Sequence, residues 1–417
     1  MSKKVKKQNG GSGSFFSLFW QPSNKLIGNG VYGCVINPPV TKNEVPFMEY
    51  LDDKRYDDVG KLFKKSYSNQ ENFKEEKKNA LLTHDFDPGS IFTVKLKGAN
   101  KINSNDLSDE IRKCINVTGK NEDIYQLIYE NGGIPLDKIK DRSITFSKFV
   151  ELISRFLYGM KQMQEYGLCH RDIKPDNVLI SDEKMNLIDF GLSDKLANVY
   201  IQQNSMFLQH ISTIYPPEFY IASLLIEYRN DKIKFRNELS YVIDKMEQKM
   251  FDHIIKDSEG NEYRVKMNYF EILFEKNIID SLKDDIRDFL REIRIKNESF
   301  SEVFNADMAR KCDIFSLLYI FKVLSKKVKI TNEIQQRQIK TLIMMCKEFN
   351  PKKRATIDDL ISFVEEMKEI AQLEMYGGKL RRCLKIPKIH NNKCSSERTK
   401  GYKCKMSNNI KKNIKLL

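Results

Sequence analysis

The sequence lacks the apolar segments with which a chain enters or crosses a membrane. No uninterrupted apolar run of eighteen occurs in its 417 residues, whereas a membrane-spanning helix needs about 20. The mostly apolar stretch at residues 15–20 is too short for the core of a signal peptide. We therefore expect an intracellular protein without a membrane span, in the cytoplasm or alternatively in the nucleus.

The sequence also has no C-x-x-C pair among its eight cysteines. Such pairs are typical of structural zinc sites and of redox motifs. The spacing of Cys383, His390, Cys394 and Cys404 fits no standard zinc site either. We therefore predict reduced thiols rather than a disulfide framework, and no structural zinc.

Acidic residues are scarce at the C-terminal end. Residues 376–417 contain thirteen Lys or Arg against one acid, Glu397, and so carry a net charge of +12 out of +14 for the whole chain. We expect a disordered basic tail at 373–417 that keeps the protein soluble or contacts nucleic acid, an anionic membrane or an acidic partner. A second flexible basic segment is expected at 1–22, where four lysines precede a Gly/Ser run.

The most informative segment present is His170-Arg171-Asp172-Ile173-Lys174-Pro175-Asp176-Asn177, followed by Asp189-Phe190-Gly191. Two short apolar strands, 178–180 and 186–188, flank a polar turn and predict a hairpin. This hairpin would place Asn177 beside Asp189, and their oxygen atoms suit a magnesium ion that keeps water and phosphate as its other ligands. Asp172 can then meet a hydroxyl that approaches the metal-bound phosphate.

The order H-R-D-x-x-x-x-N followed by D-F-G resembles the catalytic and metal loops of protein kinases. The resemblance implies an α+β fold of two lobes, a small β-rich N-lobe at about 23–130 and a large helical C-lobe at about 134–372. It also implies phosphoryl transfer from ATP to Ser or Thr hydroxyls of protein substrates, with Asn177 and Asp189 as ligands of Mg²⁺. Asp172 would accept the hydroxyl proton, and Lys174 resembles the serine/threonine-specific form of the loop.

A glycine-rich segment near the N-terminus is similar to the nucleotide loop of the same family. Residues 28–35 fit the form G-x-G-x-x-G-x-V, in which glycines let backbone amides approach phosphates. A dinucleotide-binding fold would need a helix directly after the third glycine, and Pro38 and Pro39 disfavour one. The resemblance assigns nucleotide contacts to Ile27, Gly28, Asn29, Gly30, Val31, Tyr32, Gly33, Cys34 and Val35.

The lysine that holds the phosphates in this family has two candidates. Lys61, in the apolar segment 59–63, is favoured over Lys95. A charged helical stretch at 69–83 and then a strand at 91–96 follow Lys61 in the order typical of the family.

The helix at 69–83 should supply a glutamate that holds this lysine. We prefer Glu76 to Glu75, although either can belong to a solvated charged face. A buried strand is predicted at 125–129. The segment 130–133 after it resembles the hinge between the lobes, where Glu130 and its neighbours would bind adenine through backbone groups.

Three polar residues resemble the anchors of the large lobe. Glu218, which follows two prolines, stands in place of the glutamate of A-P-E and is expected to form a buried ion pair with Arg354. Asp313 is expected to hold the backbone of the catalytic loop, with Phe315 in place of the usual tryptophan. A helix with apolar spacing at 149–166 should lead into that loop.

Arg171, beside the catalytic aspartate, indicates control by a phosphate on the activation segment. Its guanidinium would otherwise lack an anion. Ser205, Ser212 and Thr213 are the candidate acceptors of that phosphate. The glycine-threonine stretch that the family has ahead of its A-P-E is missing here.

The largest departure from the family pattern lies at 219–312. Helical spacing at 219–227, 238–254 and 269–293, with a polar turn at 257–261, predicts a helical insertion that occupies about 222–308. The insertion either selects or blocks partners, or is purely structural. Such insertions, with P-P-E and many Lys, Asn and Ile residues, resemble those of divergent kinases of large DNA viruses, which would place the protein in a host cytoplasm or a virion.

Two other functions stay open at this point, an inactive kinase-fold scaffold and a small-molecule phosphotransferase. The complete set of predicted catalytic residues disfavours the scaffold. Lys174 and the ordered anchors of the large lobe disfavour the phosphotransferase. The sequence leaves the physiological substrate and the oligomeric state open.

Overall fold

The computed structural model describes eight segments of the chain, which are residues 24–29, 33–40, 58–64, 69–200, 217–239, 254–256, 262–264 and 276–375. By its internal contacts the chain divides into a unit of residues 1–372 and a unit of residues 373–417. The predicted leader at 1–22, and the predicted tail from residue 376 onward, lie outside the described residues. The lobe boundaries given above stay predictions.

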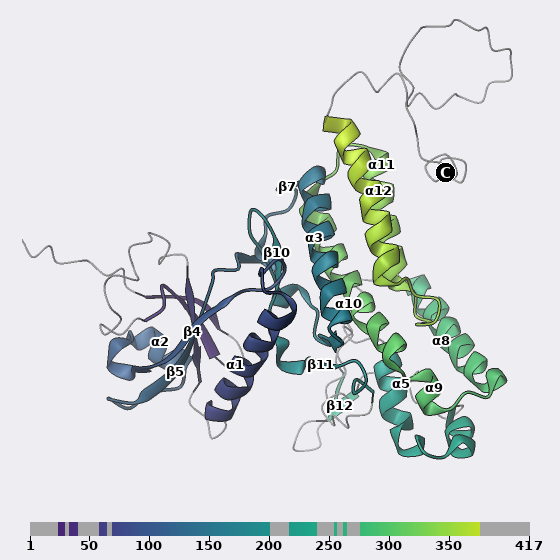
Figure 1. Cartoon of the computed structure of the whole chain (residues 1–417), viewed down its shortest axis with the longest axis horizontal. Coiled ribbons are helices and arrows are strands. Elements are labelled where there is room, and N and C mark those ends of the chain that lie inside the picture. Colours follow the sequence, from purple (N-terminus) through teal and green to yellow (C-terminus); the bar gives the residue numbers. More distant parts are fainter. Residues whose placement is uncertain are drawn as a thin grey trace, which may run out of the picture. The chain divides into compact units, whose positions relative to one another are not determined.

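A five-stranded antiparallel sheet forms the N-terminal part of the described chain (Figure 1), and it is the β-rich lobe that the sequence predicts. The strand order is β1-β2-β3-β5-β4. The bounds are β1 Lys25–Asn29, β2 Gly33–Asn37, β3 Val59–Phe63, β4 Leu96–Asn103 and β5 Asp123–Tyr129. The predicted strands at 59–63 and 125–129 are thus confirmed.

Helix α1, Asn69–Phe86, confirms the helix predicted at 69–83 and extends it by three residues. The strand predicted at 91–96 is wrong, because β4 begins only at Leu96. The carboxylate of Asp87 accepts the backbone N–H groups of Ile91 at 2.8 Å, Phe92 at 3.1 Å and Thr93 at 2.9 Å. These donors are bonded to a side chain and cannot join a sheet ladder.

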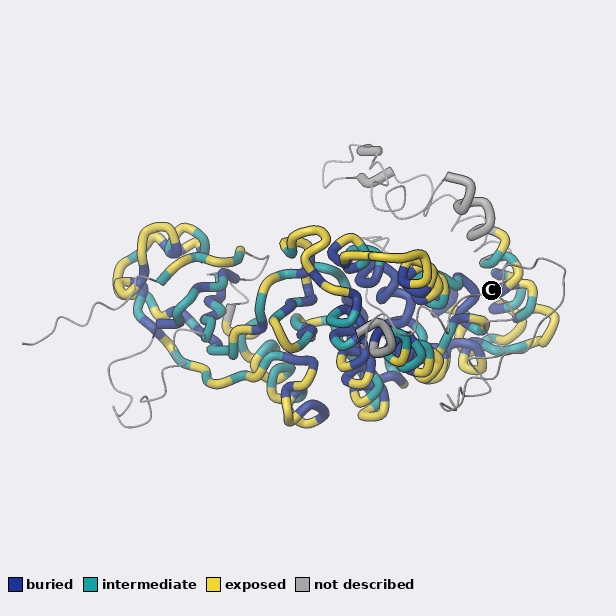
Figure 2. Tube along the Cα trace, turned by 90° about the horizontal axis from the view of Figure 1, so that it is seen from above, coloured by how far each residue is buried: buried dark blue, intermediate teal, exposed yellow. Residues whose placement is uncertain are grey.

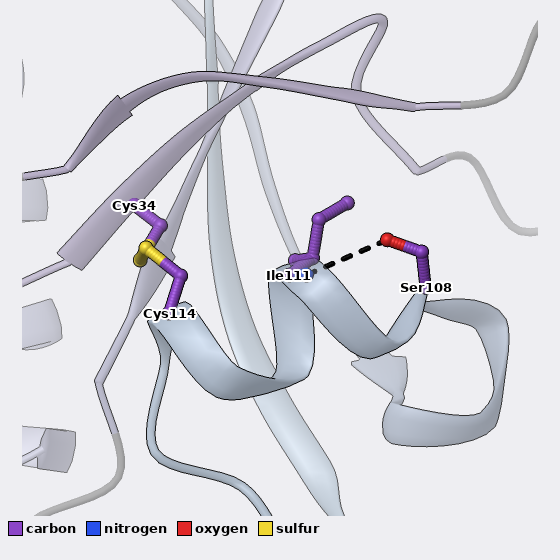
Figure 3. The surroundings of a disulfide bond; sticks show 4 residues. All are labelled: Cys34, Ser108, Ile111 and Cys114. Atoms are coloured by element: carbon purple, nitrogen blue, oxygen red, sulfur yellow. Dashed lines mark hydrogen bonds between the residues drawn. A yellow bond between two sulfur atoms is a disulfide. The ribbon is translucent and has the colours of Figure 1, made fainter.

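A short helix, α2 (Asp109–Cys114), packs on the sheet through an apolar cluster that contains Cys34, Ile111 and Ile115. Cys34 and Cys114 form a disulfide (Figure 3). The prediction of reduced thiols is therefore wrong for this pair. Since 80 residues separate the two cysteines, no local spacing could reveal the bond. The other described cysteines, which are free and buried, are Cys169, Cys312 and Cys346.

The C-terminal part is helical (Figure 1). Its helices are α3 Phe146–Glu165, α5 Pro217–Leu225, α8 Lys276–Lys296, α9 Phe300–Val303, α10 Ala306–Lys327, α11 Glu333–Lys347 and α12 Ile357–Met375. Residues 232–239 are also helical. Buried segments, dark blue in Figure 2, run through these helices. In the described part of the chain, no helix is both long and apolar enough to span a bilayer.

Helix α3 confirms the helix predicted at 149–166, and its apolar side chains are buried as the spacing requires. It begins at Thr145, whose Oγ1 accepts the N–H of Lys148 at 3.2 Å. It ends before Gly167, whose φ of +87° suits a glycine. Helix α12 lies beside α3 (Figure 1), joined to it by a 3.0 Å hydrogen bond from Ser154 Oγ to Glu365 Oε1.

Short strands and single helical turns complete the large lobe. The predicted hairpin is confirmed, although its second strand begins one residue earlier than expected. The short strands are β6 Ile134–Pro135, β7 Ile144–Thr145, β8 Leu168–Cys169, β9 Val178–Ile180, β10 Met185–Leu187, β11 Asp194–Lys195 and β14 Val328–Lys329. The 3₁₀ turns are η3 Ser104–Asp106, η4 Leu136–Lys138, η5 Pro175–Asn177, η6 Phe190–Leu192 and η7 Ile226–Tyr228.

The predicted insertion is helical only in part. Helices α5, 232–239 and α8 lie in it, but the helix predicted at 238–254 is wrong at its end, because Ile254 belongs to a strand. Strand β12, Ile254–Lys256, pairs antiparallel with β13, Glu262–Arg264. Apolar and aromatic residues on both sides of a polar Gly-containing turn favour such a hairpin over a helix.

A buried ion pair joins the start of α5 to the turn before α12. Arg354 donates from Nη1 and Nη2 to the two carboxylate oxygens of Glu218, and both side chains are fully buried. The guanidinium also donates to the carbonyl oxygens of Glu348 and Lys311, each at 2.8 Å. It lies 4.9 Å from the centre of the Phe315 ring, so phenylalanine provides the aromatic face expected from tryptophan. The predicted pair of Glu218 and Arg354 is confirmed.

Replacing Arg354 by methionine should strongly destabilise the protein. The change leaves the carboxylate of Glu218 buried without its partner, which costs about 3–5 kcal/mol of unfolding free energy. Urea unfolding followed by tryptophan fluorescence and circular dichroism measures the loss. The matched control is Arg310→Met, since Arg310 pairs with the exposed Asp307 and should cost less than about 1 kcal/mol. Equal losses in both variants would contradict this role for the pair.

Candidate active site

The catalytic loop holds three of the predicted residues together by direct hydrogen bonds. Asn177 Nδ2 donates to the backbone oxygen of Asp172 and to its Oδ2, each at 2.9 Å. Lys174 Nζ donates to the same Oδ2 at 2.7 Å. Asp172 and Asn177 are buried, whereas Lys174 is partly exposed. One oxygen of Asp172 is therefore fixed by two donors, and Oδ1 is left for a reacting group.

Asp313, in α10, fixes the backbone that precedes Asp172. Its carboxylate accepts the N–H of His170 at 2.7 Å and that of Arg171 at 3.0 Å, and its side chain is buried. Arg171 has a φ of +68°, a conformation that costs a non-glycine residue about 1–3 kcal/mol. The charged acceptor offsets this strain because it forms two charge-assisted hydrogen bonds. The role predicted for Asp313 is confirmed.

His170 connects the catalytic loop to the segment that contains Asp189. Its Nδ1 accepts the N–H of Asp172 at 3.2 Å, and its Nε2 lies 3.1 Å from the carbonyl oxygen of Ile188. These partners assign the proton to Nε2 of a neutral ring. Burial lowers the pKa of His170 despite the nearby carboxylates of Asp313 and Asp172.

The hairpin of β9 and β10 brings Asn177 and Asp189 to the same end. Val178 pairs with Leu187, and the N–H of Ile188 donates to the carbonyl oxygen of Asn177 at 3.0 Å. Asp189 follows directly, is exposed and has a φ of +66°. A Cβ at Gly191 would lie 3.3 Å from Asp189 Oδ1, so glycine leaves room for this carboxylate.

Lys61 and Glu76 form the predicted ion pair, with 2.6 Å between Lys61 Nζ and Glu76 Oε2. Tyr129 Oη donates to the other oxygen, Oε1, at 3.3 Å. Burial raises the pKa of Glu76, the positive charge of Lys61 opposes this rise, and the negative charge of Asp189 adds to it. Lys95 and Glu75 are both exposed, so the preference for Lys61 and Glu76 is confirmed.

Helix α1 carries Glu76 and also contacts the segment after Asp189. Asn79 Nδ2 donates to the carbonyl oxygen of Phe190 at 3.1 Å. The Phe190 ring packs against those of Phe86 at 5.8 Å and His170 at 4.6 Å between ring centres. The ion pair and the catalytic loop are thus connected through Phe190.

The glycine-rich loop is described at its two ends only. Ile27, Gly28 and Asn29 end β1, while Gly33, Cys34 and Val35 begin β2, and Gly30, Val31 and Tyr32 lie outside the described residues. A Cβ at Gly33 would collide with the carbonyl oxygen of Leu62. Cys34 is buried and bonded to Cys114, so Cys34 can serve a nucleotide only through its backbone.

Glu130 begins the predicted hinge segment. Its N–H donates to the carbonyl oxygen of Lys95 at 3.0 Å, and its Oε1 accepts from Lys184 Nζ at 3.0 Å. Gly133, three residues later, has a φ of +105°, and a Cβ there would collide with the carbonyl of Ile180. The N–H and the side chain of Glu130 are therefore engaged within the protein. Adenine would need other backbone groups of the segment 130–133.

Comparison with known proteins agrees with this geometry. Residues 96–230 match the family model described as the protein kinase domain. The chain carries a protein kinase domain.

Similar proteins include cyclin-dependent kinase F-3 of Oryza sativa subsp. japonica, 31% identical over 107 residues, which cover 25% of this chain and 24% of that protein. A putative serine/threonine-protein kinase of Acanthamoeba polyphaga mimivirus, R436, is 39% identical over 67 residues, covering 16% of this chain and 24% of the relative. The probable serine/threonine-protein kinase irlC of Dictyostelium discoideum is 31% identical over 94 residues, covering 22% and 6%. The chain thus spans about a quarter or less of the length of these relatives.

The surroundings of Arg171 correct one expectation for this kinase domain. Arg171 Nη1 lies 3.4 Å from Asp194 Oδ2, and the guanidinium lies 5.8 Å from the centre of the Phe219 ring. The inference that this guanidinium would lack an anion without a phosphate is therefore wrong. The predicted phosphate acceptors Ser205, Ser212 and Thr213 lie outside the described residues.

Sequence reasoning missed three residues that support the site of the kinase domain, namely Asn79, Tyr129 and Asp194. Tyr129 ends the strand that was predicted to be buried, and a phenol at such a position needs a polar partner. Asp194 lies five residues after Asp189 in the chain, but only the antiparallel pairing of β11 with β8 brings it beside Arg171. A tertiary contact of this kind leaves no pattern in a single sequence.

Acid should destabilise the kinase domain through His170. Because burial lowers its pKa, the folded state binds fewer protons there than the unfolded chain. Its contribution to stability is therefore present above the ordinary histidine pKa of about 6.5 and is lost as the pH falls below it. Protonation of Nδ1 would also remove the acceptor of the Asp172 N–H.

The thermal midpoint of the wild type should drop between about pH 7.5 and pH 5.5 more steeply than that of His170→Gln. The variant will be less stable than the wild type at the higher pH. His84→Gln is the matched control, since His84 is exposed on α1, and it should retain the acid sensitivity of the wild type. Equal slopes for His170→Gln and wild type would show that another group is responsible.

Proposed function

We propose that the protein transfers the γ-phosphate of ATP to serine or threonine hydroxyls of protein substrates. The observation that carries this proposal is the arrangement at Asp172, whose Oδ2 accepts from Lys174 at 2.7 Å and from Asn177 at 2.9 Å. A buried carboxylate held in this way keeps one oxygen in a fixed position for a hydroxyl. Such positioning supplies much of the acceleration in phosphoryl transfer.

Asp172 would orient the incoming hydroxyl and accept its proton as the new bond to phosphorus forms. Lys174, whose ammonium lies 2.7 Å from Asp172 Oδ2, would place positive charge where negative charge develops on the transferred group. Asn177 would keep the carboxylate from rotating, because its amide holds both the backbone and the side chain of Asp172.

Lys61 would bind the phosphates, held in place by Glu76 at 2.6 Å. The ends of the glycine-rich loop support this role, since Val35 pairs with Lys61 across β2 and β3, and Gly28 pairs with Val35 across β1 and β2. Backbone groups of residues 27–35 would approach the phosphates from this side. The segment 130–133, with Glu130 at its start, would bind adenine.

The side chains of Asn177 and Asp189 fit a magnesium ion by their chemistry. They offer amide and carboxylate oxygens, and Asn177 directs its Nδ2 to Asp172, which leaves its Oδ1 for a cation. The described residues contain no group of three or more His, Cys, Asp or Glu side chains that could hold a metal alone. Magnesium commonly takes one or two protein oxygens with substrate phosphates and water, and supplies neutralising charge.

Two features support a protein substrate with a Ser or Thr acceptor. Lys174 matches the serine/threonine-specific form of the catalytic loop, and two similar proteins carry serine/threonine-protein kinase in their names. The buried pair of Glu218 and Arg354 supports a protein substrate, because it anchors the segment next to which kinases receive substrate peptides.

Asp172→Asn should lower the turnover number by about 10²–10⁴-fold, because the amide cannot accept the hydroxyl proton. Transfer of radiolabelled γ-phosphate to a library of Ser, Thr and Tyr peptides measures the loss and the acceptor preference, and Ser or Thr peptides should be labelled. The matched control is Asp176→Asn, an identical change at an exposed position of the same loop, which should retain activity.

Nucleotide affinity should be nearly equal in Asp172→Asn and wild type, which separates lost chemistry from lost folding. Equal transfer by Asp172→Asn and wild type would contradict the proposal. Labelling of sugars, lipids or antibiotics in place of peptides would favour a small-molecule phosphotransferase.

A further inference from the structure

The disulfide of Cys34 and Cys114 lies next to the proposed nucleotide loop. Cys34 directly follows Gly33 at the start of β2, and Cys114 is the last residue of α2. Figure 3 shows the two side chains meeting between the strand and the end of the helix. The bond therefore attaches the strand that leaves the glycine-rich loop to a helix 80 residues later in the chain.

The two sulfur atoms differ in their surroundings. Cys34 is 0% exposed and belongs to the apolar cluster of the sheet, whereas Cys114 is only partly buried. A thiolate that opens a disulfide must approach one of its sulfurs from outside. The attack would therefore fall on Cys114, and Cys34 would be the leaving group.

We propose that Cys34 and Cys114 form a thiol–disulfide exchange site for small thiols of the glutathione class, and that its state sets the affinity for nucleotide. The second part rests on the proposed function. To close the bond, oxidised glutathione reacts with the Cys114 thiolate to give a mixed disulfide and one reduced glutathione. The Cys34 thiolate then displaces the second reduced glutathione. The two thiol protons pass to the departing thiolates, and reduction reverses both steps.

The pairing of β2 explains how this bond reaches the nucleotide site. Within the sheet, Cys34 lies opposite Asn29 of β1 and Leu62 of β3, and the next residue, Val35, lies opposite Lys61. A bond from Cys34 to α2 fixes the position of this strand. Opening the bond leaves β2 held by its ladder and by apolar contacts alone, so binding must order the loop at a greater cost.

Helix α2 is a suitable fixed point for this attachment. Ser108 Oγ accepts the N–H of Ile111 at 3.4 Å at the start of the helix (Figure 3), and Ile111 and Ile115 are buried against the sheet. These contacts do not involve either sulfur. The helix can therefore remain in place when the bond is opened, which permits a reversible change at β2.

The exchange site can be tested on the full-length protein without any activity measurement. The protein is equilibrated at a series of ratios of reduced to oxidised glutathione, quenched with acid, alkylated and digested. The peptides that contain Cys34 and Cys114 should be recovered linked at oxidising ratios and separately alkylated at reducing ratios. A bond that never forms, or one that persists at every ratio, would overturn the proposal.

Nucleotide affinity is then measured by calorimetry with ATP and Mg²⁺ in oxidising and reducing glutathione buffers. The oxidised wild type should bind about threefold or more tightly than the reduced form. Cys114→Ser should bind equally in both buffers, at the affinity of the reduced wild type. Cys346→Ser, which removes a buried thiol elsewhere, should keep the difference.

Equal affinities of the oxidised and reduced wild type would leave the bond a structural crosslink and overturn its regulatory part. Absence of nucleotide binding in both buffers would instead contradict the proposed function, and with it the coupling. The peptide map would still decide whether the exchange site exists, so the two failures are distinguishable.

Discussion

The carboxylate of Asp313 is the contact on which the geometry of the site depends. Buried in α10, it accepts two backbone N–H groups of the catalytic loop and holds Arg171 at a φ of +68°. A neutral side chain would form weaker hydrogen bonds there, and the loop could relax away from this strained conformation. The preceding turn of the same helix contributes Lys311 and Cys312, which contact Arg354 and Glu218. One helix therefore positions both the catalytic loop and the buried ion pair.

The ion pair of Lys61 and Glu76 depends on this same framework through α1. Asn79 binds the carbonyl oxygen of Phe190, and the N–H of Leu187 donates to the carbonyl oxygen of Phe92 at 2.7 Å. The helix that carries Glu76 and the segment that follows it are thus bonded to the hairpin that carries Asp189. Since these bonds involve backbone groups, they fix position more than they fix side-chain identity. The proposed phosphate-binding lysine and the proposed metal ligands are held by a continuous set of contacts.

Much of the site could be predicted from the sequence because its chemistry lies in short segments. Residues 170–177 and 189–191 carry the catalytic loop within one hairpin, and local apolar patterns located that hairpin to within one residue. Asp87 shows the limit of such patterns, because its side-chain hydrogen bonds keep residues 91–93 out of the strand that their composition favours. The bond of Cys34 with Cys114 shows another limit, since residues 80 apart meet only after the sheet and α2 have packed. Tertiary packing decided these cases, and it leaves no signal in a single sequence.

The charge of Arg171 shows how far the anchoring of the following segment is built into the fold. Asp194 supplies a carboxylate 3.4 Å from this guanidinium, and Phe219 covers it with an aromatic ring. Glu218, the neighbour of Phe219, is held in turn by Arg354. The chain between residues 195 and 217 is therefore fixed at both ends by buried arginines, whatever lies between. A phosphate added to that stretch would meet a guanidinium already beside a carboxylate, so any gain from their attraction would be reduced by repulsion from Asp194.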